Sequence, residues 1–323
     1  QLSVLLLAIV ALAWAAMHIF GRDTADASLS QRMALWQQTL ALIGQFHWTG
    51  VGWSQLNFVW TLSPFADRAP DVFDHAHNLP LHLAAELGVP VTLGVFALLL
   101  AALWPPGAWH KAATGPQGAA VLSTASLLAA IALHSLFEYP LWFSYFLLPT
   151  AFLLATLARL LRPGNATKAA TKPSIARASL SSPWPLASAG ALALVTTLWG
   201  VHEYNKASAI HYSGRDAVAQ ARAVDTARAS PLYGQYGDYA AIMLAGDRAP
   251  LEWFARPIRN VLDERLLTAW ARALQRAGQH ERAAWVVARA REFPPDAAFA
   301  GLPQVTAPLN PASAPRSAAD FRR

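Results

Sequence analysis

Residues 74–78, Asp-His-Ala-His-Asn, combine side-chain types and spacing that could carry acid–base chemistry. An imidazole changes its protonation near neutral pH, and a carboxylate beside it can fix which ring nitrogen holds the proton. His75 and His77 supply the imidazoles, and Asp74 or Asp71 can supply the carboxylate. The segment stands just before a helical pattern that enters an apolar stretch, where ionisable groups are costly and usually functional. We therefore predict chemistry on a lipid-linked substrate at a lipid–water boundary.

The helix expected after the two histidines carries a polar stripe. Asn78 can cap its first turn, where Pro80 is tolerated. Asn78, His82 and Glu86 then recur every four residues, which places them on one helix face. Either this stripe points into a substrate site, or it is a solvated helix end of the kind common at membrane surfaces. We expect Pro90 to kink the helix where it enters the membrane.

Further charged residues stand close to apolar stretches. Arg32 lies one turn before Trp36 on a helical pattern. A guanidinium at an interface can bind a phosphate or pyrophosphate through two hydrogen bonds, or it can snorkel to lipid head groups. His134 and Glu138 end another apolar stretch, where a carboxylate needs a partner such as Arg32 or a histidine. The alternative there is a simple turn before Pro140.

Metal and cofactor signals are weak. Asp74, His75 and His77 form an incomplete zinc ligand set with none of the common spacings. The chain has no cysteine, which excludes a disulfide framework and a cysteine nucleophile. It also has no glycine-rich phosphate loop, no Asp-x-Asp pair and no Gly-x-Ser-x-Gly elbow. We expect neither a metal nor a cofactor.

Composition indicates a membrane protein. Only 14% of the 323 residues are charged and 54% are apolar, whereas soluble proteins carry about a quarter charged residues. The 13 tryptophans suit the aromatic belts found at membrane surfaces. Stretches close to the roughly 20 residues that cross a bilayer occur at 2–20, 88–104, 118–137, 141–161 and 184–201.

Loop charges predict the orientation of these spans. The loops 105–117 and 162–183 carry basic residues and no acids, whereas acids outnumber arginines in 21–87. Because basic loops stay in the cytoplasm, the segment 21–87 faces outward. The chain opens inside an apolar run without a methionine, so we interpret it as the C-terminal part of a longer membrane protein.

These patterns predict an all-α fold, a polytopic membrane helix bundle of about five spans with a small soluble helical C-terminal domain. The membrane domain covers 1–201 and carries the site in segment 21–87. An interfacial amphipathic helix is expected there from the helical repeat of Leu29, Met33, Trp36, Leu40 and Ile43. Gly50-Val51-Gly52-Trp53 predicts a tight turn after it.

The soluble domain is expected over 202–302. Leu267, Trp270 and Leu274 repeat at helical spacing, and Gly278 separates them from a second helix. Such a hairpin resembles one tetratricopeptide unit, and two or three soluble helices are expected in all. Acids and bases alternate here, which argues against nucleic-acid binding. Residues 303–323 are rich in proline, alanine and serine and are expected to be disordered.

Several of these motifs together resemble the Wzy-C region of O-antigen ligases, O-antigen polymerases and bacterial O-linked oligosaccharyltransferases. The matching segments are Arg32-x3-Trp36, Thr49-Gly50-Val51-Gly52-Trp53, His75-Ala76-His77-Asn78-Leu79 and Glu86-Leu87-Gly88. The segment from His134 to Trp142 is similar to one in the pilin-glycosylating branch. The resemblance covers about residues 20–160 well and the tail loosely.

The resemblance implies transfer of a glycan from an undecaprenyl-pyrophosphate carrier, without a metal, on the periplasmic face of the bacterial inner membrane. It implies that Arg32 engages the pyrophosphate and that His77 is catalytic. His77 could then take a proton from an acceptor serine or threonine hydroxyl, oriented by Asp74 or Asp71. The resemblance also implies upstream helices, without which the activity of this part of the protein is in doubt.

Rival functions remain at this level. The soluble helices favour a protein acceptor such as a pilin or another periplasmic protein, because helical hairpins commonly form interaction surfaces. Ligation to lipid A-core and polymerisation of repeat units are the close alternatives. A flippase or other transporter, or a non-catalytic membrane scaffold, would belong to a different class; a transporter would favour charges near the middle of the spans.

Overall fold

The computed structural model describes residues 22–105, 107–162, 184–214, 216–293, 302–303 and 309. Every regular element within these ranges is helical, which confirms the all-α prediction. The expected span 2–20, nearly all of the loop 162–183 and most of the tail 303–323 lie outside the described residues.

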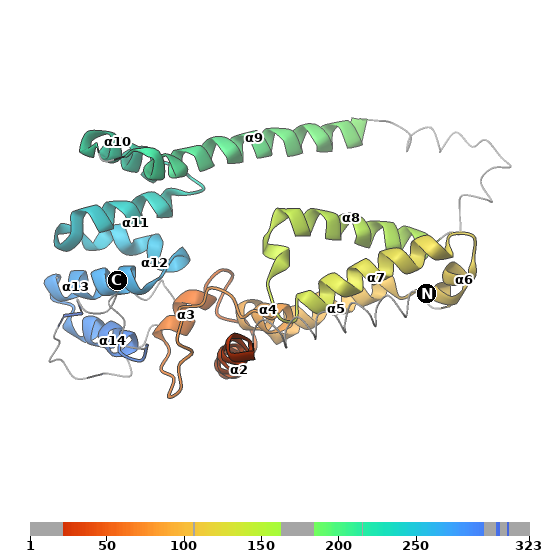
Figure 1. The fold of residues 1–323 in the computed structure, drawn as a ribbon, viewed down its shortest axis with the longest axis horizontal. Helices are drawn as coiled ribbons and strands as arrows, with labels where there is room; N and C mark the ends of the chain where they lie inside the picture. Colours follow the sequence, from red (N-terminus) through yellow and green to blue (C-terminus); the bar gives the residue numbers. More distant parts are fainter. Residues whose placement is uncertain are drawn as a thin grey trace.

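The helices form two groups joined by a short central segment (Figure 1). Figure 1 places α5, α7 and α8 together at one end, and stacks α10 to α14 at the other, with α2 to α4 between them. Their bounds are α2 Arg22–Gln45, α3 Leu56–Leu62, α4 Leu79–Leu87, α5 Val89–Leu103, α6 Ala108–Thr114, α7 Gly118–His134, α8 Ser144–Leu160, α9 Trp184–Tyr212, α10 Ala217–Arg228, α11 Gly234–Ala245, α12 Pro257–Asn260, α13 Glu264–Arg276 and α14 His280–Ala290, with short 3₁₀ turns η1 Pro140–Trp142, η3 Gly246–Arg248 and η4 Leu251–Ala255.

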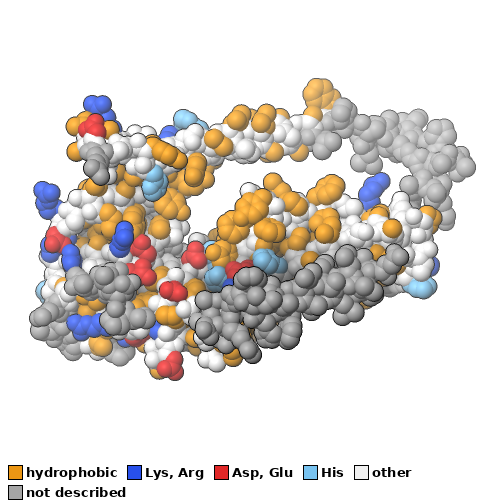
Figure 2. Space-filling view, in the orientation of Figure 1, with side chains coloured by type: hydrophobic (Ala, Val, Ile, Leu, Met, Phe, Trp, Pro, Cys, Tyr) orange, Lys and Arg blue, Asp and Glu red, His pale blue; other side chains and the backbone are white. Residues whose placement is uncertain are grey.

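Helices α5, α7, α8 and α9 occupy the four expected spans that the structure describes, and they leave large apolar side chains exposed. In Figure 2 hydrophobic side chains are prominent over α7, α8 and α9, whereas charged side chains gather over the stack α10 to α14. Taken singly, none of the described helices is both long and apolar enough to cross a bilayer. The bent pair α5 and α6, at 49° to each other, meets the requirement by length and composition only. The number of spans therefore stays a prediction.

The C-terminal helical part of the described chain, residues 202–293, is called the tail below. It shares one hydrophobic core with the segment 21–87. Trp60 of α3 and Trp270 of α13 are both almost fully buried in it. Asn57 ties the two parts together: its amide donates to the carbonyl of Leu262 at 3.4 Å, and its Oδ1 accepts from the Leu262 N–H at 3.2 Å. The expected boundary at residue 202 falls inside α9, which runs without a break to Tyr212. The division into domains stays a prediction.

The helical hairpin of the tail is confirmed. Leu267, Trp270 and Leu274 of α13 are buried, and Gly278 adopts φ of +74° before α14 begins. The expected number of two or three helices in this part was too low, because α10, α11 and α12 precede the hairpin. The sequence gives little sign of α10, because few of its side chains are buried and its apolar pattern is weak. Its buried side chains are Val224 and Ala227.

Helix α2 forms as expected but buries a different face. The buried side chains are Leu35, Gln38, Thr39 and Leu42, whereas much of the predicted apolar stripe, including Met33, is exposed. The polar members of the buried face are satisfied: Gln38 Oε1 accepts from the indole N–H of buried Trp60 at 2.9 Å. The buried face of α2 therefore combines two leucines with hydrogen-bonded polar side chains, and much of the predicted apolar stripe faces outward.

Two glycine motifs interlock through their backbones. The Val51 N–H donates to the Ala85 carbonyl at 2.8 Å, and the Gly52 N–H donates to the Glu86 carbonyl at 3.0 Å. A Cβ on Gly50, whose φ is +67°, would lie 2.3 Å from the Glu86 carbonyl carbon. Because Gly50 has no side chain, the backbone of the turn can pack directly against the end of α4. The chain also breaks at Gly88 (φ +80°) between α4 and α5, which corrects the expected kink at Pro90.

We expect Gly50→Ala to destabilise the protein by about 2–4 kcal/mol, because neither the positive φ nor the backbone contact tolerates a methyl group. Thermal unfolding of the purified protein in detergent measures this. Gly44→Ala is the matched control, since a Cβ there meets nothing within 4 Å, and an alanine in a helix should be neutral or stabilising. Equal melting temperatures for the two variants would contradict the interlock.

Candidate functional site

One carboxylate joins the two residues singled out above. Glu138, in the turn after α7, forms an ion pair with Nη2 of Arg32 on α2. Its other oxygen lies 2.8 Å from Nδ1 of His77. All three side chains are partly exposed. The structure therefore brings positions 32, 77 and 138 together, and Glu138 has both of the partners considered for it.

Hydrogen bonds from neighbouring residues hold the three elements in place. The indole N–H of Trp36 donates to the Ala76 carbonyl at 2.9 Å, which fixes α2 against the histidine segment. Asn78 caps α4 as predicted, accepting from the Leu81 N–H at 3.0 Å. Its amide also donates to the Leu136 carbonyl at 3.1 Å. Asn78 therefore helps to hold the histidine segment beside the turn that carries Glu138.

His77 has a strained backbone, with φ of +47°. A residue other than glycine adopts this conformation rarely, and the surrounding structure must hold it there. The ring of Tyr139 packs edge-on against the imidazole at 4.8 Å. When Nδ1 carries its proton toward Glu138, the other nitrogen, Nε2, keeps a lone pair for a substrate. The geometry therefore suits a base that is oriented by a carboxylate.

The expected orienting carboxylate was wrong. Asp74 Oδ1 lies 2.8 Å from Nδ1 of His75 rather than beside Nδ1 of His77, and Asp71 is exposed. Partial desolvation opposes ionisation of Asp74, but His75, with a smaller contribution from His77, holds the pKa of Asp74 below its ordinary value. The correct partner, Glu138, is 61 residues away from His77 in the sequence. Local spacing cannot reveal such a contact.

His75 stands in a stack of rings instead. It lies parallel to Tyr139 at 4.3 Å and to His82 at 5.2 Å. Tyr139 contacts both His75 and His77, so one phenol ring links the two imidazoles. His75 therefore borders the Arg32–Glu138–His77 cluster without joining it.

His82 and Glu86 are buried and support the site. Both oxygens of Glu86 accept backbone hydrogen bonds, from Ser54 at 2.9 Å and Leu56 at 3.1 Å. His82 Nδ1 accepts from the Ala76 N–H at 3.3 Å, and its Nε2 lies 3.4 Å from Glu86. The polar stripe predicted on α4 thus exists, but its last two members bind the protein's own backbone. Their roles as substrate ligands stay a prediction.

Ionised Glu86 should stabilise the fold. Burial alone would raise its pKa, but the His82 imidazole and the two backbone N–H groups together hold the pKa of Glu86 below the ordinary 4.5. A lowered carboxyl pKa gives stability that is complete above the ordinary pKa and lost as the pH falls through the folded value. The fold should therefore lose this contribution below about pH 4.5.

We expect Glu86→Gln to cost about 1–3 kcal/mol of stability at neutral pH, and to lose less stability than the wild type between pH 5 and pH 3. Melting temperatures across that pH range measure both effects. Glu252→Gln, at an exposed position of η4, serves as the control and should change neither. A Glu86→Gln protein with the wild-type acid response would contradict the assignment.

His134 does not join the cluster. Its imidazole is exposed and packs against Phe146 of α8 at 6.1 Å, while its carbonyl accepts from the Glu138 N–H at 3.0 Å. No three His, Asp or Glu side chains among the described residues converge in a way that would hold a metal ion. His75 faces Asp74 and His77 faces Glu138, so the zinc ligand set considered above does not assemble.

A small cavity of about 160 Å³ opens beside His75. We call it the Arg259 pocket; its lining residues are Trp53, Ser54, Asn57, Asp74, His75, His82, Glu86, Trp142, Arg259 and Asn260. Arg259 belongs to α12 in the tail, and no motif in the sequence pointed to it. Its position follows from the docking of the tail on Asn57, which the sequence does not reveal.

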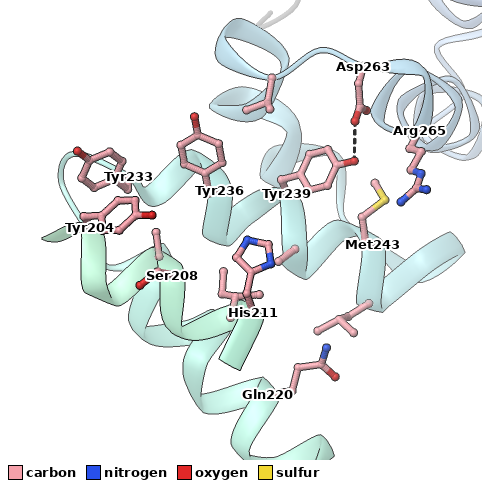
Figure 3. Close-up of a pocket in the computed structure, with 15 residues that line it drawn as sticks. Tyr204, Ser208, His211, Gln220, Tyr233, Tyr236, Tyr239, Met243, Asp263 and Arg265 are labelled. Atoms are coloured by element: carbon pink, nitrogen blue, oxygen red, sulfur yellow. Dashed lines mark hydrogen bonds between the residues drawn. The ribbon is translucent and has the colours of Figure 1, made fainter. Parts of the chain in front are cut away.

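A larger cavity of about 760 Å³ lies within the tail between α9 and α11 (Figure 3). We call it the tyrosine groove. Its most prominent lining residues are the four tyrosines shown in Figure 3, Tyr204, Tyr233, Tyr236 and Tyr239. Tyr239 donates to Asp263 at 2.8 Å, and Asp263 also caps α13. The groove also contains Met243 and several aliphatic side chains.

Two family matches relate the chain to membrane-bound polymerases and O-antigen ligases. Residues 122–306 match a family described as the C-terminal part of a virulence factor membrane-bound polymerase. Residues 2–96 match a family described as O-antigen ligase. Because the first match covers more than half of the chain, the protein belongs to this membrane-bound polymerase C-terminal family. The second match supports the resemblance to the Wzy-C region.

One curated relative is a general O-oligosaccharyltransferase of Acinetobacter baylyi, which is 33% identical over 127 residues. The matched region is 39% of this chain and 21% of the relative, so the chain spans only about a fifth of that protein. No solved structure matches the chain.

Proposed function

We propose that this protein transfers a glycan from an undecaprenyl-pyrophosphate carrier to the hydroxyl of an acceptor, on the periplasmic face of the bacterial inner membrane. The observation that carries the proposal is the Glu138 carboxylate shared by Arg32 and His77. It places a base and a guanidinium beside each other, next to helices that expose apolar side chains. The two family matches support the same reaction class.

The cluster can perform each half of the reaction. His77 Nε2 takes the proton of the acceptor hydroxyl while Glu138 stabilises the imidazolium that forms. The acceptor oxygen attacks the anomeric carbon, the bond from that carbon to the phosphate oxygen breaks, and the lipid pyrophosphate leaves. In-line attack of this kind inverts the anomeric carbon. The leaving group is already activated, so the protein mainly positions the partners and stabilises charge.

Arg32 uses one of its guanidinium nitrogens on Glu138. A guanidinium has five N–H donors, so the others can bind oxygens of the departing pyrophosphate. Glu138 would then hold both the base and the anion-binding group in one orientation. This combines the role expected for Arg32 with the ion pair that the structure shows.

The tyrosine groove favours a protein acceptor over lipid A-core. Tyrosine and methionine are enriched at protein interfaces and charged residues are depleted there. The groove is close to this composition: tyrosines line it, and Met243 and Leu244 add apolar surface. Its charged lining residues are Asp263, which is already paired with Tyr239, and Arg265, a residue type also enriched at interfaces. An acceptor polypeptide docked here could present a serine or threonine to the cluster.

Replacing a groove residue should weaken binding of a protein acceptor alone. We expect Tyr236→Ser to raise KM for the protein acceptor about 5- to 30-fold, without changing KM for a short serine peptide too small to reach the groove. Tyr212→Ser is the matched control, because Tyr212 is 86% exposed and does not line the groove. An equal loss with both acceptors would count against docking in the groove.

The proposal is tested by reconstituting the full-length protein with an undecaprenyl-pyrophosphate-linked oligosaccharide. A periplasmic protein, lipid A-core and the donor alone are offered as acceptors, and intact-mass spectrometry follows the products. Addition of the glycan mass to serine or threonine supports the proposal. Transfer to lipid A-core alone would make the protein a ligase, and lengthened donor a polymerase. Movement of labelled carrier lipid across the membrane without any glycan transfer would make it a transporter. If neither transfer nor movement is detected, the protein is a non-catalytic scaffold.

A further inference from the structure

We propose that the Arg259 pocket is a sugar subsite that holds one ring of the donor glycan, with Arg259 as a direct ligand. This rests on the glycan transfer proposed above and extends it to a residue of the tail. Arg259 reaches the pocket from α12, whereas the Arg32–Glu138–His77 cluster is built from α2 and from the segments before α4 and after α7. The tail would then take part in substrate binding.

The guanidinium Nε of Arg259 lacks a hydrogen-bond partner within the described part of the chain. This nitrogen is buried, and the Arg259 side chain forms no ion pair with a described residue. A buried guanidinium N–H without an acceptor costs free energy comparable to a lost charged hydrogen bond. Because Arg259 lines a cavity, a ligand that brings acceptor oxygens into the pocket would remove this cost.

Some of the other polar lining groups already bond within the protein, and others are able to bond a ligand. Glu86 and Asn57 have their polar atoms engaged by the protein itself. Asp74 is 64% exposed and uses one oxygen on His75, so it can accept further hydrogen bonds. A ligand in the pocket therefore meets a guanidinium that donates and a carboxylate that accepts. Hydroxyl groups, which donate and accept, satisfy both.

Aromatic walls complete the pocket. The indoles of Trp53 and Trp142 lie nearly parallel, with an angle of 16° and centroids 6.3 Å apart. Trp142 also meets His75 edge-on at 5.0 Å. Such rings offer flat apolar surface beside polar groups, which suits a pyranose with its C–H faces and its rim of hydroxyls. The volume of about 160 Å³ is several times the roughly 30 Å³ share of one liquid water, which fits a single ring.

Charge favours a neutral ligand over a phosphate. Two carboxylates, Asp74 and Glu86, line the pocket, and both have pKa values held below their ordinary range. They oppose a single guanidinium, Arg259. A pyrophosphate would bring further negative charge close to these acids, whereas a sugar brings none. The location fits as well, because the Tyr139 ring contacts both His75, which lines the pocket, and His77 of the cluster.

Binding measurements with two matched lipids test the subsite. The probes are undecaprenyl-pyrophosphate-linked oligosaccharide and undecaprenyl pyrophosphate without sugar, titrated into the full-length protein in detergent. We expect Arg259→Ala to weaken binding of the glycan-linked lipid about 10- to 100-fold, and to leave binding of the sugar-free lipid unchanged. Arg259→Lys should fall between, since it keeps the charge and loses the planar fork. Trp53→Ala should show the same selectivity for the glycan-linked lipid.

Arg248→Ala, at an exposed position of η3, is the control and should bind both lipids as the wild type does. Equal weakening of both lipids by Arg259→Ala would overturn the proposal in favour of a phosphate site. Unchanged binding of both, at an unchanged melting temperature, would overturn it outright. Because binding needs no turnover, these results are separate from the transfer assay: a protein that binds the glycan selectively but transfers nothing would defeat the proposed function and leave the subsite standing.

Discussion

Replacing His77 with alanine should abolish glycan transfer to within background. A positioned general base contributes about 10²- to 10⁴-fold to a rate, and His77 is the imidazole held against Glu138 at 2.8 Å. Rates measured with the lipid-linked donor under saturating conditions give kcat directly. The loss should fall on kcat rather than on donor binding, because the proton moves only in the reaction step.

The comparison variant is His110→Ala, which removes an exposed histidine of α6. It should leave kcat unchanged. Among the described residues, the His77 ring makes its ring contacts with Phe73 and Tyr139, so its removal should disturb packing at the site itself and not elsewhere. Should His77→Ala retain kcat within a few-fold of the wild type, the base is another group and the proposed mechanism fails.

Glu138→Gln should have the second largest effect, with a fall in kcat of about 10²- to 10⁴-fold. The amide keeps the shape of the side chain but not its charge, so it no longer stabilises the imidazolium of His77 and no longer pairs with Arg32. We expect the double variant Glu138→Gln with His77→Ala to be little worse than His77→Ala alone, because residues that act as a unit are not additive.

Asp247→Asn provides the matched control for Glu138→Gln. Asp247 pairs with Arg272 at 3.3 Å on the surface of the tail, where an ion pair contributes little. Its amide variant should transfer glycan normally. If the fold-loss in kcat of the double variant equals the product of the two single fold-losses, Glu138 and His77 act separately. That result would contradict the shared cluster.

Local chemistry was largely readable from the sequence. The cap at Asn78, the turn at Gly50 and the helical hairpin around Trp270 each follow from residue types at fixed short spacings. Such features depend on hydrogen bonds and backbone conformations that span a few residues, and those leave a direct mark on the sequence.

Other features depended on how distant segments pack. The buried face of α2 includes Gln38 beside Leu35 and Leu42, because the Gln38 side chain meets Trp60 rather than solvent. A polar residue in a helical pattern predicts an exposed face, so the apolar stripe pointed to the wrong side. The expected kink at Pro90 was likewise displaced to Gly88, where a Cβ would meet the backbone of Trp48 at 2.4 Å.

The sequence by itself determined that this chain is helical, rich in apolar helices and equipped with two histidines beside carboxylates at their edge. Only the tertiary structure decided which carboxylate serves which histidine, and that a tail arginine reaches the neighbouring pocket. The reason is physical: Glu138 lies 61 residues from His77, and Arg259 is placed by a contact that joins residues 205 positions apart. Distances of that kind are set by the packing of whole helices, and no local pattern of residues records them.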